Sequence, residues 1–162
     1  MNHVVVDSPI GPLRLEANER ALTRVDLPNR VDERVTGPTN HPVLRAALRE
    51  LAAYFEGTLQ KFETPFELEG TEFQRLAWSA LVEIPYATTR SYAEQARAIG
   101  RPTATRAVGA ANGKNPIPII VPCHRVLGAN GSLTGFGGGV EVKRWLLDHE
   151  ARHAGLRLPL PL

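Results

Sequence analysis

The first part of the chain alternates between apolar and polar residues in the way that β-strands do. Residues 3–7 form a β-branched run, and residues 13–16 and 22–27 alternate with a period of two. Turn-forming residues separate these runs at positions 8–12 and 17–20. The pattern predicts three strands, and the last two form a hairpin.

Residues 42–57 change to a helical pattern. Gly57 is a natural stop, and apolar side chains recur at helical spacing at Leu44, Leu48, Leu51 and Phe55. The flanking segment 28–42 is rich in Pro, Gly, Asn and charge, and is interpreted as a mobile surface loop of unknown position. Residues 58–70 look extended. We place a domain boundary there, which gives an N-terminal structural domain over 1–70 and a C-terminal domain over 71–162.

The C-terminal part is mainly helical. Thr71 and Gln74 fit a capping box, and the helix behind them ends before Pro85. Its expected apolar face consists of Phe73, Leu76, Ala77, Ala80, Leu81 and Ile84. Ser91 and Glu94 fit a second capping box.

That second box opens a short helix that stops at Gly100, and a further helix follows over 104–112. Two short helices joined by a turn have the proportions of a helix-turn-helix, although many antiparallel helix pairs look the same. Asn130-Gly131 predicts a tight turn. A last amphipathic helix is expected over 140–154, followed by a frayed Pro-rich tail over 156–162.

Residues 115–126, called the proline segment from here on, contain the only cysteine of the chain, Cys123. Prolines at 116, 118 and 122 each fix φ and favour extended geometry at the residue before. We therefore expect a stiff, extended segment with a buried apolar middle over 119–121. A free cysteine is usually a small buried apolar residue, and that interpretation stands beside a reactive one.

Composition narrows the class of protein. The 162 residues are 43% hydrophobic and 22% charged, as in globular proteins, and no run of 18 apolar residues predicts a membrane span. With one cysteine and no signal-peptide pattern, we expect a reducing, cytoplasmic location and no cysteine-rich metal site. Residues 1–70 carry a net charge of −3 and residues 71–162 carry +5. This asymmetry favours a polyanionic partner for the second half, although it can also arise by chance.

At Pro122-Cys123-His124-Arg125-Val126 the chain resembles the O6-alkylguanine-DNA alkyltransferases, also called methylated-DNA–protein-cysteine methyltransferases. Further similar motifs occur in order at Ile84-Pro85-Tyr86, Ser91-Tyr92, Arg106-Ala107-Val108-Gly109, Asn115-Pro116, Gly135-Phe136-Gly137-Gly138-Gly139 and Trp145 to Glu150. The resemblance implies an α+β fold. A small antiparallel, ribonuclease H-like N-terminal domain would pack on a helical, winged-helix-like C-terminal domain with a helix-turn-helix.

The resemblance also implies single-turnover DNA repair. An alkyl group would move from O6 of guanine, and possibly from O4 of thymine, to Cys123. Because an unperturbed thiol is mostly protonated at neutral pH, it needs a base. His124 would act through a bridging water with Glu150 as its anchor, and Asn115 would tie the recognition helix to the proline segment. No cofactor or metal is expected.

For the partner, the resemblance implies duplex DNA bound through its minor groove with little sequence preference. Arg106 would fill the gap left by the everted base, Tyr92 would contact the phosphate and N3, and Ala104, Ala107 and Arg125 would lie at the DNA. The guanine would meet the carbonyls of Cys123 and Val126, the amide of Gly137 and the ring of Phe136. Phe136 stands where many members have Tyr, which leaves the range of alkyl groups open.

Two other classes compete with this interpretation. One is a non-catalytic binder of damaged DNA, whose known examples lack the cysteine that is present here. The other is a thiol hydrolase, for which no oxyanion site is readable. We expect a nucleoid-associated monomer, and the sequence leaves open whether it binds DNA cooperatively.

Overall fold

The fold is described from a computed structural model over residues 2–133 and 136–155. The chain divides into two compact units, Met1–Glu69 and Gly70–Leu162, which are described separately. The expected tail over 156–162 and Gly135 of the glycine cluster lie outside the described residues.

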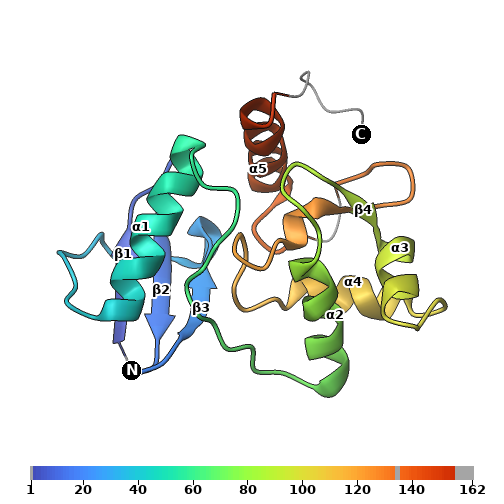
Figure 1. Cartoon of the computed structure of the whole chain (residues 1–162), viewed down its shortest axis with the longest axis horizontal. Helices are drawn as coiled ribbons and strands as arrows, with labels where there is room; N and C mark the ends of the chain where they lie inside the picture. Colours follow the sequence, from blue (N-terminus) through green and yellow to red (C-terminus); the bar gives the residue numbers. More distant parts are fainter. Residues whose placement is uncertain (1, 134–135, 156–162) are drawn as a thin grey trace. The chain divides into compact units, whose positions relative to one another are not determined.

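The first unit is a three-stranded antiparallel sheet with one helix on it (Figure 1). The strands are β1 (Asn2–Val6), β2 (Leu13–Ala17) and β3 (Leu22–Asp26), in that spatial order. Alternate side chains of β2 are buried, and they face α1 (Pro42–Glu56), which contacts all three strands. The alternation of period two therefore has its expected cause, because one face of the sheet is covered.

The helix α1 has the ends that its sequence predicts. Pro42 occupies its first turn, and the chain leaves through Gly57, whose φ of 87° lies in the left-handed region that glycine tolerates. The Gly57 amide then bonds back to the carbonyl of Ala53. The strands and helix expected for this half are confirmed.

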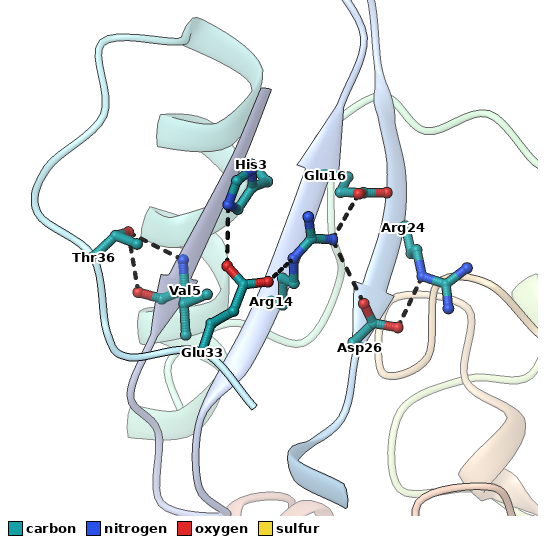
Figure 2. Close-up of polar contacts among 8 residues, drawn as sticks. All are labelled: His3, Val5, Arg14, Glu16, Arg24, Asp26, Glu33 and Thr36. Atoms are coloured by element: carbon teal, nitrogen blue, oxygen red, sulfur yellow. Dashed lines mark hydrogen bonds and ion pairs between the residues drawn. The ribbon is translucent and has the colours of Figure 1, made fainter. Parts of the chain in front are cut away.

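The loop over 28–42 begins with η1 (Pro28–Arg30) and then follows the edge strand β1. The Thr36 amide donates to the Val5 carbonyl at 2.9 Å, and its hydroxyl accepts from the Val5 amide at 3.1 Å. Glu33 pairs with His3 at 3.2 Å and with Arg14 at 2.7 Å (Figure 2). The loop thus covers part of an otherwise open sheet edge. This pairing is tertiary, so local composition could not place the loop.

The second unit contains α2 (Glu72–Val82), α3 (Tyr92–Ala98), α4 (Thr105–Gly113) and α5 (Val140–His153). The short strands β4 (Arg90–Ser91) and β5 (Val126–Leu127) pair in parallel, and η2 (Cys123–Arg125) is one turn of 3-10 helix. The helices α2, α3 and α4 pack against one another (Figure 1). Both capping boxes form as predicted, at Thr71 with Gln74 and at Ser91 with Glu94.

The buried face of α2 differs from the predicted one. Leu76 is 36% exposed, whereas Trp78 is buried and donates its indole N–H to the Ala111 carbonyl of α4 at 2.8 Å. A side chain at Gly70 would lie 2.6 Å from the Trp78 ring, so glycine is required where the chain passes the indole. Apolar spacing alone did not separate these two faces, because α2 carries apolar residues around more than half of its circumference.

A buried amide pair joins α3 to α4. The side chains of Gln95 and Asn112 bond to each other at 2.9 and 2.7 Å, and Gln95 also donates to the Ala77 carbonyl of α2 at 3.0 Å. Gly100 closes α3 with a φ of 73°. These contacts fix the relative placement of the two helices predicted as a helix-turn-helix.

The proline segment is not extended, contrary to the prediction. The Val121 amide bonds to the Ile117 carbonyl at 2.9 Å, the Cys123 amide bonds to the Val121 carbonyl at 2.8 Å, and Ile119 has a φ of 75°. Proline constrains its own φ and the preceding residue, but it leaves Ile119, which follows Pro118, able to turn. The left-handed conformation of a β-branched residue costs on the order of 1–3 kcal/mol. The predicted burial of residues 119–121 is confirmed.

Candidate active site

Cys123 is the first residue of η2, and only 7% of its surface is exposed. Burial raises the pKa of its thiol, while a hydrogen bond with the Asn115 side chain and the positive charge of Lys143 act in the opposite direction. The sulfur therefore lies among polar groups, although it is largely removed from solvent.

Asn115 holds the turn in front of the cysteine. Its amide nitrogen donates to the Val121 carbonyl at 2.7 Å, and its side-chain oxygen accepts from the Ile117 amide at 3.0 Å. The Asn115 side chain thus bonds to both ends of the turn formed by residues 117–121. It also links the end of α4 to the residues that lead to Cys123.

His124 and Glu150 form a buried pair. The Nε2 atom of His124 lies 2.7 Å from a carboxylate oxygen of Glu150, and neither side chain is exposed. Glu150 also accepts from the Ala87 amide at 3.1 Å, and Ala87 holds a left-handed φ of 58° to present that amide. The strained left-handed conformation of Ala87 thus orients its amide toward the Glu150 carboxylate.

Arg125 makes two further bonds to the same carboxylate, from Nε at 2.9 Å and from Nη2 at 3.0 Å. Its Nη1 donates to the Ile84 carbonyl at 2.7 Å, and its guanidinium lies over the Tyr86 ring. The expectation that Arg125 lies at the DNA is wrong, because the side chain is buried and bound to Glu150. The acidic partner of Arg125 lies 25 residues away in the sequence, so local pattern could not indicate this pairing.

Burial, together with two neighbouring cations, favours the neutral form of His124. Burial lowers its pKa, and the neighbouring charges of Arg125 and Lys143 oppose the effect of Glu150. Burial alone would raise the pKa of Glu150, but His124 and Arg125 outweigh it and hold that pKa well below its usual range. An ionised carboxylate only accepts hydrogen bonds, so Nε2 of His124 carries the proton. The other ring nitrogen, Nδ1, is then a base, and it has no hydrogen-bond partner among the described residues.

Lys143 is the site residue that the sequence reasoning missed. It lies in α5 with no exposed surface, and its Nζ donates to the Val126 carbonyl at 2.5 Å. The ammonium also lies 5.8 Å from the centre of the Tyr92 ring and 6.0 Å from that of Phe136. A lysine in the first turn of a helix is normally expected on the surface. Only the burial of the residues around Lys143 could have indicated that this lysine belongs to the site.

The residues expected to contact the guanine lie around Lys143. Tyr92 is half-buried at the start of α3, and burial and the charge of Cys123 raise its pKa. Phe136 is half-buried and Gly137 is exposed. The carbonyl of Val126 is bonded to Lys143, and that of Cys123 to the Val126 amide, so each of these two expected acceptors already holds one hydrogen bond.

The outer face of α4 carries the residues expected at the DNA. Arg106 and Ala107 are exposed and Ala104 is half-buried. Behind them, Gly109 lies against Tyr92, since a side-chain carbon at this glycine would be 3.8 Å from the ring. The helix that carries this small-residue face and its one arginine therefore packs against Tyr92.

Two absences apply to the described ranges, 2–133 and 136–155. No group of three or more His, Cys, Asp or Glu side chains there could hold a metal ion. None of the helices in those ranges has both the length and the apolar character needed to cross a membrane.

Fold and site together define a class of protein: two small units, one of which holds a buried cysteine and, next to it, a histidine paired with a glutamate, in the same unit as a helix-turn-helix. Comparison with known proteins identifies the family. Residues 72–152 match the 6-O-methylguanine DNA methyltransferase DNA-binding domain, and residues 1–68 match the ribonuclease-like domain of the same proteins. The chain belongs to the 6-O-methylguanine DNA methyltransferase family, and the predicted family and α+β fold class are confirmed.

Individual relatives are similar over nearly the whole chain. The methylated-DNA–protein-cysteine methyltransferase of Mycolicibacterium paratuberculosis is 50% identical and aligns with 96% of this chain and 95% of its own length. The protein of that name from Methanosarcina acetivorans is 47% identical, covering 93% and 98%. The crystal structure of Mycobacterium tuberculosis OGT in complex with DNA has a TM-score of 0.84 at 48% identity, with 93% of each chain covered.

Proposed function

We propose that this chain is a methylated-DNA–protein-cysteine methyltransferase, which repairs DNA by moving an alkyl group from O6 of guanine to Cys123. The observation that carries the proposal is the position of Cys123 directly before the buried His124–Glu150 pair, in a chain of this family. Within the chain, residues 71–162 would bind DNA and perform the transfer, and residues 1–70 would be structural.

The proton of the thiol leaves through a bridging water to Nδ1 of His124. The commitment of Nε2 to Glu150 supports this route, because it leaves Nδ1 as the basic nitrogen. The thiolate then attacks the alkyl carbon. A sulfur–carbon bond forms, the carbon–O6 bond breaks, and its electron pair stays on the guanine. Tyr92 supplies a proton to N3 of the departing guanine, and the proton taken from the thiol passes from His124 through water to Tyr92, so that guanine, His124 and Tyr92 all end neutral.

The alkylated base must leave the helical stack to reach a thiol this deeply buried. Eversion costs a few kcal/mol, which contacts with the deformed duplex offset. We propose that the small-residue face of α4 enters the minor groove and that Arg106 occupies the vacated stack. The exposure of Arg106 and Ala107 supports this placement. Phosphate contacts would make binding salt-dependent and nearly independent of sequence, whether the monomer acts alone or cooperatively.

The product is a thioether, which no neighbouring group can cleave, so each molecule acts once. We expect the same site to accept O4-alkylthymine where the smaller ring fits the guanine contacts. Since the substrate is genomic DNA, the working protein would associate with the nucleoid.

The stoichiometry of repair tests this proposal. With excess duplex containing O6-methylguanine, the protein should restore at most one equivalent of guanine. Cys123→Ala should restore none, while its affinity for duplex DNA stays within a few-fold of the unaltered chain. Several equivalents per molecule, or transfer by Cys123→Ala, would refute the proposal.

A further inference from the structure

The first unit contains a cavity of about 290 Å³ between the turn that follows β1 and the second half of α1. Its floor is formed by Leu13 and Leu51, which are both buried. Its walls include the half-buried side chains of Val6, Leu48 and Phe55. Every lining residue belongs to the first unit, and a space of this size with apolar walls accepts a ligand of one or two small rings.

Two exposed carboxylates, Asp7 and Glu56, form the mouth of this cavity. The hydroxyl in the lining, that of Ser8, already donates to the Gly11 carbonyl at 2.6 Å and accepts from the Ile10 amide at 3.2 Å. None of the described residues that line the cavity is basic. The polar part of a ligand at the mouth would therefore meet negative charge.

The end of α1 adds to this negative potential. The carbonyl end of a helix carries a partial negative charge, so a cation there is favourable and a carboxylate is not. The last turn of α1 nevertheless has no basic residue, and Glu56 is the residue that ends the helix. Residues 1–70 also carry a net charge of −3. The carboxylate at this helix end is thus an electrostatic cost, which a bound cation would remove.

We propose that this cavity binds a small amphiphilic cation, which is a molecule with an apolar ring or chain and one ammonium group. The apolar part lies against Leu13 and Leu51, and the ammonium faces Asp7 and Glu56. A bare inorganic cation would gain nothing from the apolar floor, and an uncharged ligand would gain nothing from the carboxylates. The site belongs to the unit that takes no part in the proposed transfer, so it is independent of the role of Cys123.

Three probes that share one ring system test the class of ligand. Tryptamine carries an ammonium group, 3-methylindole carries no charge, and indole-3-propionate carries a carboxylate. In an NMR titration of the backbone amides of the full chain, tryptamine should give saturable shifts at residues 6–13 and 48–56. Because two exposed carboxylates contribute to its binding, 3-methylindole should bind about tenfold more weakly. Indole-3-propionate should give no saturable shifts at these residues.

Two substitutions separate the contribution of charge from that of the cavity. Glu56→Gln keeps the shape of the mouth and should weaken tryptamine binding about threefold, with little change for 3-methylindole. Glu63→Gln, at an exposed carboxylate that does not line the cavity, is the matched control and should bind tryptamine like the unaltered chain. Ala52→Phe places a ring in the cavity from an exposed position of α1 and should abolish the binding of both compounds.

Several results would overturn the proposal. Tryptamine could fail to bind at millimolar concentration, or it could shift only amides outside the two ranges. Indole-3-propionate could bind as tightly as tryptamine, which would remove the role of the carboxylates. Tryptamine binding that Glu56→Gln leaves unchanged would have the same meaning. These titrations use no DNA, so a failure of the repair function would be seen separately.

Discussion

At the scale of single residues, the site depends on how one carboxylate is shared. Glu150 accepts hydrogen bonds from His124, Arg125 and the Ala87 amide. If His124 were its only cationic partner, the imidazole would be drawn toward its charged form. Because Arg125 already neutralises Glu150, the histidine can be held in place and still be neutral. A neutral histidine is what proton removal from a thiol requires.

This balance predicts the effect of Arg125→Met on the pH dependence of transfer. Without the guanidinium, Glu150 raises the pKa of His124, so more of the histidine is protonated and inactive as a base. The acid limb of the single-turnover rate profile should move to higher pH, with a loss of about tenfold near pH 6.5.

Arg125→Lys, which keeps the positive charge, is the matched control and should move the limb much less. If Arg125→Met lowered the rate by the same factor at every pH, the arginine would be acting through structure rather than through the protonation of His124.

At the scale of elements, the helix-turn-helix is held by polar contacts inside an apolar core. Gln95 and Asn112 satisfy each other, and the Trp78 indole satisfies the last turn of α4. A buried amide needs its partner, so the pair permits one relative position of α3 and α4. That position sets where the outer face of α4 lies.

The pair predicts non-additive effects on stability. Gln95→Leu or Asn112→Leu alone leaves a buried amide unsatisfied and should lower the free energy of unfolding by about 1–3 kcal/mol. The double variant should cost clearly less than the sum of the two, because neither orphaned amide remains. Urea unfolding of all four proteins measures this, and simple additivity would show that the two side chains act independently.

Local sequence signals predicted most of these elements and few of their contacts. Capping boxes, Gly57 and the alternation of the strands are local, and the elements they predict are present. The turn at Ile119 follows from tertiary burial, which overrides the preference of a β-branched residue. Arg125 and Lys143 each owe their role to a group far away in sequence, so residue type and spacing could not reveal it.

At the scale of the whole molecule, the same buried groups make stability depend on pH. The unfolded chain binds a proton at His124 below about 6.5, whereas burial lowers the pKa of the folded imidazole, so stability falls as pH drops below that value. Glu150 contributes stability that is complete above about 4.5 and is lost as pH falls further, since its folded pKa is depressed. Both effects therefore lower the free energy of unfolding as the pH falls.

The free energy of unfolding should therefore decline from about pH 6.5 downward and more steeply below about 4.5. Glu150→Gln should be less stable at neutral pH and should show a shallower decline in the lower range. Urea titrations at a series of pH values provide the curves. Parallel curves for the two proteins would show that Glu150 is not the group whose protonation destabilises the fold.

The central claim is that Cys123 accepts the alkyl group, and mass spectrometry tests it most directly. After incubation with a duplex containing one O6-methylguanine, the intact protein should gain the mass of one methylene group. Peptide mapping should place that mass on Cys123. An unchanged protein mass alongside repaired DNA, or a methyl group on any other residue, would contradict the account.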